Sequence, residues 1–417
     1  MNNFVNNFTN KHNHLDVLLA LRGFACLMVV IIHCNPPRNS IIYKGYDLSW
    51  LSFSHGMVAV WVFFCLSGYL MGKCFYAERY SADVNGVINF WCNRALRIFP
   101  LYYFAILILS IFVYPDLLKI TNWGYLLRVC TFTYQPYISI SGLEFNAVIW
   151  SLSTEVQFYL LIPFVYNLLR YSLFSQQRVL LLGISIILMT FLCKCIFWFS
   201  FQREITENIG YVFKYWYSPL ITNLDIFLCG FLVNAFIKYQ KRILSQLETP
   251  NNYSFATYLK KNKLKLLAVL LLILLYIFTA HHFYFQELWG LPNRPSGMRT
   301  STTIFILQPL TAIVTSFFIF AFETDDYHNF TRNEKLSFSS VLKNPIRLLE
   351  VFGNLSFGIY IWHAPILSRI NPIFTSDTAI EAFLSRLTAT IILSIILATT
   401  TYYLIELPGA RLKIYRQ

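Results

Sequence analysis

Charged side chains are scarce in this sequence. Asp, Glu, Lys and Arg make up 13% of its 417 residues, whereas soluble domains carry about a quarter. Hydrophobic residues make up 56%, which is more apolar surface than the core of a chain of this length can bury, so lipid must cover the rest. The composition excludes an ordinary soluble enzyme and predicts a polytopic membrane protein.

Signatures of metal sites, disulfides and secretion are also missing. The nine cysteines show neither the paired spacing of zinc ligands nor an even disulfide framework, and most of them fall within apolar segments. The adjacent histidines His281 and His282 have no third ligand converging on them in the sequence. The polar tail 1–15 is followed by an apolar run without a small-residue cleavage site, which indicates a retained helix rather than a signal peptide. We expect no metal site.

Ten apolar runs are long enough, at about 17 to 25 residues, to cross a bilayer. They lie at 16–35, 55–72, 98–114, 147–169, 179–199, 219–237, 264–281, 301–322, 349–369 and 384–406. The predicted fold is therefore an all-α polytopic transmembrane helix bundle, with one domain over residues 1–417. An eleventh crossing is added if the aromatic segment from Pro115 to Asn146 also enters the membrane.

Basic residues give the orientation of the bundle. The net charge of +13 is compatible with nucleic-acid binding, but Lys and Arg of a polytopic chain collect in its cytoplasmic loops. With the N-terminus inside, roughly two thirds of the basic residues fall in cytoplasmic segments, including a basic loop at 238–263 that faces the lipid leaflet. We predict that both termini are cytoplasmic, that membrane lipids are partners and that nucleic acid is not.

Two polar residues interrupt the first predicted span, Arg22 and His33. Eleven positions of a helix make about three turns, so both side chains point to one face and lie about 16 Å apart along the axis. A charged residue within a span normally faces the interior of the bundle or a cavity. The alternative is an arginine that extends to the lipid headgroups and a histidine at the interface.

Further ionisable residues fall at a similar predicted depth: Glu155, Asp225 and His363. Two imidazoles and two carboxylates near one level of the membrane indicate a polar cavity. A carboxylate beside a histidine fixes the tautomer of the ring and makes it a better general base for a hydroxyl. Either carboxylate is a candidate partner for either histidine, and a proton relay would use the same residues.

A second polar group lies at the predicted cytoplasmic face, where Arg94 and Arg97 enter the third span. Together with Arg22 they form a candidate site for phosphates, because guanidinium groups bind phosphate oxygens in pairs. Topological anchoring explains each arginine alone equally well. Within the second span, Ser67 and Gly68 allow close helix packing or the close approach of a ligand to the backbone.

Seven stretches, in this order, resemble the acyltransferase 3 family of integral membrane O-acyltransferases. They are Arg22 through His33, "FFCLSGYL", "NRALRIFPLYY", "WSLSTEVQFYLLIP", "LDIFLCGFL", "LSFGIYIWHAPI" and "YYLIELP". Any one of them is weak evidence, but seven at sensible spacings between residues 16 and 408 cover nearly the whole chain.

The resemblance implies an enzyme of the bacterial inner membrane. An acyl group, most often acetyl, is taken from cytoplasmic acyl-coenzyme A and passed to a hydroxyl of a glycan or lipid-linked saccharide of the envelope, such as lipopolysaccharide O-antigen. His33 corresponds to the catalytic histidine, as general base or as transient acyl carrier, and Arg22 to its partner toward the donor. Arg94 and Arg97 match arginines near the coenzyme A phosphates, and Glu155 matches the acid of the "WSLS" motif.

The sequence departs from the family pattern in three places. Val156 stands where many members have a second acidic residue. Leu407 replaces a frequent basic residue, which leaves Glu406 without a local partner. The sequence also leaves no room after Arg416 for the SGNH-type domain that some members carry, so we expect a chain without that domain.

Two alternatives to this interpretation are open. A proton-coupled glycolipid transporter or flippase also needs ionisable residues within its spans, although it does not explain the paired arginines together with the seven motifs. If the protein is an acyltransferase, one alternative is that its donor is succinyl-coenzyme A. Another alternative is an acceptor other than an envelope polysaccharide: a macrolide, a signalling oligosaccharide or peptidoglycan.

Overall fold

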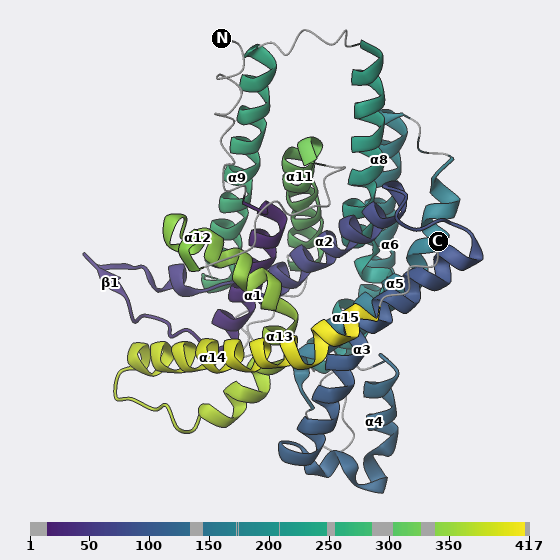
Figure 1. Ribbon diagram of the computed structural model, residues 1–417. Coiled ribbons are helices and arrows are strands. Elements are labelled where there is room, and N and C mark those ends of the chain that lie inside the picture. Colours follow the sequence, from purple (N-terminus) through teal and green to yellow (C-terminus); the bar gives the residue numbers. More distant parts are fainter. Residues whose placement is uncertain are drawn as a thin grey trace.

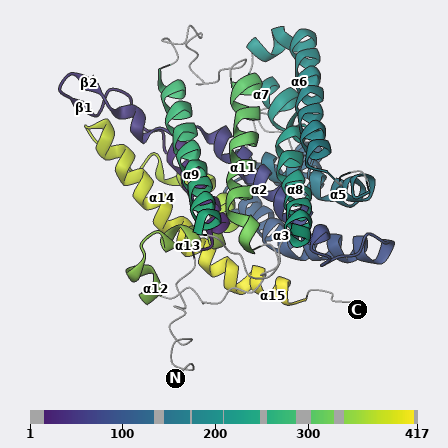
Figure 2. The same ribbon diagram turned by 90° about the horizontal axis from the view of Figure 1, so that it is seen from above.

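The computed structural model describes residues 15–133, 145–171, 173, 175–207, 209–247, 255–285, 303–326 and 338–412. In these ranges the chain is a bundle of helices, and its described strands form one short hairpin that projects from the bundle (Figures 1 and 2). The predicted all-α helix bundle is confirmed.

The α-helices have the following bounds. They are α1 (Val17–His33), α2 (Gly56–Tyr76), α3 (Val84–Phe112), α4 (Trp123–Cys130), α5 (Trp150–Leu169), α6 (Gln176–Glu207), α7 (Ile209–Val212), α8 (Leu224–Leu247), α9 (Phe255–Tyr284), α11 (Gln308–Asp326), α12 (Phe338–Lys343), α13 (Arg347–Ile370), α14 (Ala379–Thr401) and α15 (Leu407–Arg411). The antiparallel hairpin pairs β1 (Ile42–Tyr43) with β2 (Tyr46–Asp47).

Short turns of other helix types connect these elements. The 3₁₀ turns are Ser49–Ser52, Pro115–Leu118, Ile120–Asn122, Ala147–Ile149 and Ile221–Asn223, and the π-helical turns are Phe213–Tyr217, Thr303–Leu307 and Tyr402–Glu406. The last of these joins α14 to α15. Side-chain caps fix the starts of two helices. Asp16 accepts a hydrogen bond from the backbone N–H of Leu19 in α1, and Asp83 accepts one from the backbone N–H of Gly86 in α3.

Each of the ten predicted spans falls on a helix. Among the described residues, eight helical segments are long and apolar enough to cross a membrane; they contain α2, α3, α5, α6, α8, α9, α11 and α14. The apolar α1 has 17 residues and α13 has 24, and α13 carries charged residues such as Arg347 and Glu350 at its start. The chain is therefore treated as an integral membrane protein.

Two sequence predictions about loops are modified by the structure. The predicted basic loop 238–263 is in large part helical, because α8 continues to Leu247 and α9 begins at Phe255. In the segment 115–146, residues 134–144 lie outside the described ranges. Its described part forms 3₁₀ turns and α4, whose eight residues rise only about 12 Å. This part does not cross the membrane.

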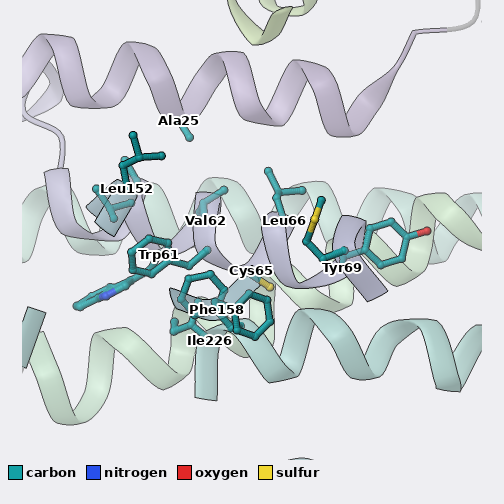
Figure 3. Packing of buried hydrophobic residues seen from close by; sticks show 14 of the residues in the cluster. Ala25, Trp61, Val62, Cys65, Leu66, Tyr69, Leu152, Phe158 and Ile226 are labelled. Atoms are coloured by element: carbon teal, nitrogen blue, oxygen red, sulfur yellow. The ribbon is translucent and has the colours of Figure 1, made fainter. Parts of the chain in front are cut away.

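The position of each helix follows from how much of it is buried. In the span that contains α2, 89% of the apolar stretch is buried, compared with 22% in the spans that contain α6 and α9. Figure 3 shows residues of α2, among them Trp61 and Leu66, packed with Phe158 of α5 and Ile226 of α8. Helix α2 is thus the centre of the bundle, and the apolar outer helices present surface that suits lipid.

Glycines set the two closest helix crossings. A Cβ on Gly23 of α1 would lie 1.9 Å from the carbonyl oxygen of Leu349 in α13, and one on Gly353 would lie 2.1 Å from that of Leu19. Gly68 of α2 and Gly230 of α8 make the equivalent contact between their helices, at 1.9 and 2.0 Å. Only residues without a side chain permit such backbone contact.

Helices α1 and α13 run in the same direction. Gly23 lies at Gly353, Cys26 at Ser356 and His33 at His363, so the same offset in sequence number holds along the contact. The predicted first and ninth spans of an alternating bundle must be parallel, and this arrangement agrees with that requirement. Helix α14 packs along α13 and also contacts α1, and α11 lies between α8 and α9 (Figures 1 and 2).

Candidate active site

Five of the predicted site residues line one cavity of about 90 Å³. They are Arg22 of α1, Ser67 of α2, Arg94 and Arg97 of α3, and Glu155 of α5. The side chains come from four different helices, so the packing of the bundle is what collects them. We call this space the arginine cavity.

The guanidinium groups of the arginine cavity are poorly satisfied by the protein. The Nε atoms of Arg22 and Arg94 are buried and have no hydrogen-bond partner among the described residues, and Arg97 interacts electrostatically with both of these arginines. Positive charges that repel one another inside a bundle are costly unless anions balance them. The cavity is therefore suited to an anionic ligand.

Glu406 supplies one negative charge to this group. It lies on the π-helical turn between α14 and α15, and it interacts electrostatically with Arg97 and Arg22. From the sequence we expected Glu406 to lack a local partner. The tertiary structure gives it partners from α1 and α3, more than 300 positions earlier in the chain. The closing "IELP" motif was the available signal for this residue.

Glu155 is held by hydroxyl groups rather than by a histidine. Ser67 donates a hydrogen bond of 2.6 Å to Oε1 of Glu155, and the hydroxyl of Tyr159 donates to the same oxygen. The expected pairing of this carboxylate with a histidine does not occur. Tyr159 was missed in the sequence, although its position four residues after Glu155 places it on the same helix face.

The two predicted histidines meet each other. Nδ1 of His33 lies 3.0 Å from Nε2 of His363, and the two rings are stacked with centroids 5.1 Å apart. Nδ1 of His363 lies 3.0 Å from the carbonyl oxygen of Ile359, one turn earlier in α13. His363 is fully buried, whereas His33 is exposed at the end of α1. We call these two residues the histidine pair.

Tyr360 connects the arginine cavity to the histidine pair. Its side chain lines the cavity, and its ring centroid lies 5.7 Å from that of His363. Its hydroxyl donates to the carbonyl oxygen of Val148 at 2.9 Å and lies 2.7 Å from Oγ of Ser151. Tyr360 lies within the "LSFGIYIWHAPI" stretch, which was the available signal for it, but only His363 of that stretch was singled out in the sequence.

Comparison with known proteins identifies the family of this chain. Residues 16–403 match the sequence family described as the acyltransferase domain of acyltransferase 3. The chain belongs to this family. The resemblance that the seven motifs indicated is therefore confirmed, and the transporter alternative does not account for the match.

Three relatives show how the similarity is distributed. YrhL of Bacillus subtilis (strain 168), provisionally named a peptidoglycan O-acetyltransferase, is 24% identical over 96% of this chain and 55% of its own length. O-acetyltransferase OatA of Staphylococcus aureus (strain NCTC 8325 / PS 47) is 29% identical over 37% of this chain and 25% of its own. Acyltransferase MdmB of Streptomyces mycarofaciens is 33% identical over 37% of this chain and 40% of its own.

This acyltransferase chain thus spans about half of YrhL and a quarter of OatA. No solved structure gives a significant match to it.

Two predicted residues of the acyltransferase lie away from both sites. Asp225 of α8 forms a fully buried ion pair of 2.9 Å with Lys194 of α6, and it accepts a hydrogen bond of 3.1 Å from Gln308. It does not line the arginine cavity, and its buried charge is balanced by Lys194. Gly68 does not line the cavity either; the carbonyl group of Phe227 occupies the space beside it, so its position is explained by helix packing.

The described residues of the acyltransferase contain no group of three or more His, Cys, Asp or Glu placed to hold a metal ion. What they bring together is a cavity lined by three arginines, Tyr360 at its wall, and a pair of imidazoles beyond that tyrosine. Guanidinium groups suit the charged part of a donor and an imidazole can accept a proton, so these groups are suited to a transfer reaction with a charged donor.

Proposed function

We propose that this chain is a membrane O-acetyltransferase, which moves an acetyl group from acetyl-coenzyme A to a hydroxyl of a cell-envelope glycan. The observation that carries the proposal is the double contact of Tyr360, which lines the arginine cavity and also touches His363 of the histidine pair. A donor with anionic groups at one end and a thioester at the other suits a protein in which guanidinium groups line a cavity and an imidazole lies beside a tyrosine of its wall.

The arginine cavity takes the phosphate groups of the donor. Guanidinium groups bind phosphate oxygens through paired, charge-assisted hydrogen bonds, and Nε of Arg22 and of Arg94 have no partner among the described residues. Phosphates placed there offset the repulsion among the three arginines. Ser67 and Glu155 lie on the same cavity wall and shape the site beside the phosphates.

His33 acts on the acceptor. No described residue hydrogen-bonds its Nε2, and the side chain is exposed. As a general base, Nε2 takes the proton of the acceptor hydroxyl while the oxygen attacks the thioester carbonyl carbon. The carbon–sulfur bond then breaks, and the proton passes from His33 to the departing thiolate. As a carrier, the same Nε2 attacks the thioester carbonyl carbon first, and the carbon–sulfur bond breaks to release the thiolate and leave an acyl-imidazole. The acceptor hydroxyl then attacks this carbon, the carbon–nitrogen bond breaks to restore Nε2, and the hydroxyl proton goes to the released thiolate. Both routes begin at one nitrogen.

The names of two relatives support the choice of acceptor class. YrhL and OatA are named as O-acetyltransferases, and the name of YrhL includes peptidoglycan. We therefore propose a hydroxyl of peptidoglycan or of a lipid-linked saccharide, approached at the exposed end of α1. With both termini cytoplasmic, this end of α1 faces the outer side of a bacterial inner membrane.

The test is release of free thiol from acetyl-coenzyme A by the purified full chain in detergent. The wild type is compared with His33→Ala, first alone and then with fragments of peptidoglycan and with lipid-linked saccharides. We expect release by the wild type and a loss of about 100-fold or more in the variant, since positioned general bases contribute this much. Gel filtration and thermal unfolding show whether the variant is folded.

The matched control is His281→Ala, a histidine at the end of α9 that packs against Trp50; it should release thiol at the wild-type rate. The proposal is contradicted if wild type releases no thiol with any glycan of the panel. The assignment of His33 is contradicted if folded His33→Ala is fully active.

A further inference from the structure

The hydrogen bonds of His363 define which of its nitrogens carries a proton. A carbonyl oxygen only accepts hydrogen bonds, so Nδ1 of His363, 3.0 Å from the carbonyl oxygen of Ile359, must be the donor. His363 is fully buried, and neither histidine forms an ion pair with a carboxylate among the described residues. A charged imidazole in such surroundings is costly. The ring is therefore neutral, and its Nε2 is an acceptor.

This assignment determines the state of His33. Its Nδ1 lies 3.0 Å from the accepting Nε2 of His363, so Nδ1 of His33 must carry the proton of that ring. A neutral imidazole has one N–H group. Nε2 of His33 then keeps its lone pair, and this is the nitrogen that no described residue hydrogen-bonds.

We infer that His363 is a positioning residue, which fixes the tautomer of His33 so that Nε2 is the reacting nitrogen. The inference rests on the proposed function and adds a residue to it. From the sequence we expected a carboxylate to orient the histidine; here a second imidazole does so, and it is itself fixed by the backbone carbonyl group of Ile359. His363 need not touch donor or acceptor to perform this role, because it acts through His33.

The series of hydrogen bonds from Ile359 through His363 to His33 also explains how the histidine pair supports proton transfer. When Nε2 of His33 takes a proton, the ring becomes an imidazolium and its Nδ1–H becomes a charge-assisted donor toward His363, which strengthens that hydrogen bond. The parallel packing of α1 and α13, set by the glycine contact at Gly23 and Gly353, holds the two rings at this spacing.

The first experiment measures the tautomer directly, without activity. Full-length protein with ¹⁵N-labelled histidine is reconstituted in lipid, and its nitrogen spectrum is compared with that of His33→Gln to assign the signals of residue 33. We expect a protonated Nδ1 and an unprotonated Nε2. A wild-type spectrum with the proton on Nε2 of His33 overturns the inference, whether or not acetyl transfer has been observed.

The second experiment compares two substitutions of His363. His363→Leu removes the acceptor, whereas the side-chain oxygen of His363→Gln can still accept from Nδ1 of His33. We expect His363→Leu to lower kcat by about 100-fold, at the upper end of what orienting partners of histidines contribute, with the KM for acetyl-coenzyme A changed less than about twofold because the arginine cavity is intact. His363→Gln should recover at least a tenth of the wild-type kcat.

The outcomes separate the inference from the proposed function. Absence of thioester cleavage by the wild type contradicts the proposed function, while the nitrogen spectrum still tests the tautomer. Wild-type kcat in folded His363→Leu overturns the inference and leaves the proposed function in place. If His363→Leu does not fold, the wild-type spectrum and the His363→Gln kinetics decide. His281→Leu serves as the control for loss of a histidine outside the site.

Discussion

The hydroxyl of Ser67 donates a hydrogen bond of 2.6 Å to Oε1 of Glu155. The contact joins α2 to α5 at the wall of the arginine cavity, and Tyr159 donates to the same oxygen. The carboxylate that the "WSLS" motif brings into the membrane is therefore held by two hydroxyl groups, close to arginines and apart from the histidine pair. This arrangement places Glu155 at the arginine cavity and not at the histidine pair.

Loss of the Ser67 hydroxyl should destabilise the fold around Glu155. We expect Ser67→Ala to lower the free energy of unfolding by about 1–3 kcal/mol, because a half-buried carboxylate loses one of its donors. Ser153→Ala is the matched control, since the buried hydroxyl of Ser153 has no hydrogen-bond partner among the described residues. Thermal unfolding in detergent measures both. Equal melting temperatures for the two variants would show that the Ser67 bond contributes nothing.

Removal of a cavity arginine should weaken the binding of the donor. Arg94→Ala and Arg97→Ala each remove a charge-assisted contact, which is worth about 1–3 kcal/mol and so raises the KM for acetyl-coenzyme A by about 5- to 150-fold. Arg170→Ala, at the end of α5 and outside the cavity, is the control. An unchanged KM in both cavity variants would mean that these arginines act only as topological anchors.

Glu406 should compete with the donor for the cavity arginines. In the free protein it interacts electrostatically with Arg97 and Arg22, so Glu406→Gln leaves more unbalanced positive charge and should lower the melting temperature. Bound coenzyme A supplies the missing negative charge, so the rise in melting temperature on adding coenzyme A should be larger in the variant than in the wild type.

The control for this measurement is Glu381→Gln, an exposed carboxylate near the start of α14 that accepts a hydrogen bond from Ser376. Its response to coenzyme A should equal that of the wild type. A smaller response in Glu406→Gln than in the wild type would indicate that Glu406 helps to bind the donor instead of competing with it.

The glycine contact between α1 and α13 should be necessary for catalysis. A Cβ on Gly23 would lie 1.9 Å from the carbonyl oxygen of Leu349, so Gly23→Ala must push the helices apart. We expect a loss of about 1–3 kcal/mol in stability, as in other overpacked cores, and a fall in kcat as His33 moves away from His363. Thiol release and thermal unfolding measure the two effects.

Gly124→Ala is the control for the glycine substitution, because a Cβ at this position of α4 meets no atom within 4 Å. Alanine stabilises a helix relative to glycine by about 0.5–1 kcal/mol, so this variant should be at least as stable as the wild type. Full activity and unchanged melting in Gly23→Ala would contradict the structural contact itself.

The sequence by itself determined the helices and the family. A helix that crosses a membrane must satisfy its backbone hydrogen bonds within its own segment, so the length and hydropathy of a local stretch are sufficient to place it. For the same reason the ten predicted spans all fall on helices. The family motifs are also local, and five residues that they contain, Arg22, Arg94, Arg97, Ser67 and Glu155, line one cavity in the folded chain.

Only the tertiary structure decided which of these residues meet. The periodicity of α1 places Arg22 and His33 on one face, but it contains nothing about the register of α1 against α13, which the contact at Gly23 and Gly353 sets. That register pairs His33 with His363. Likewise, neither Asp225 nor Glu406 has an evident partner in the sequence. In the structure, α8 packs against α6 and Asp225 forms an ion pair with Lys194. Glu406, on the turn after α14, interacts electrostatically with the cavity arginines. Contacts between helices depend on side-chain shape over the whole interface, and no single segment of sequence carries that information.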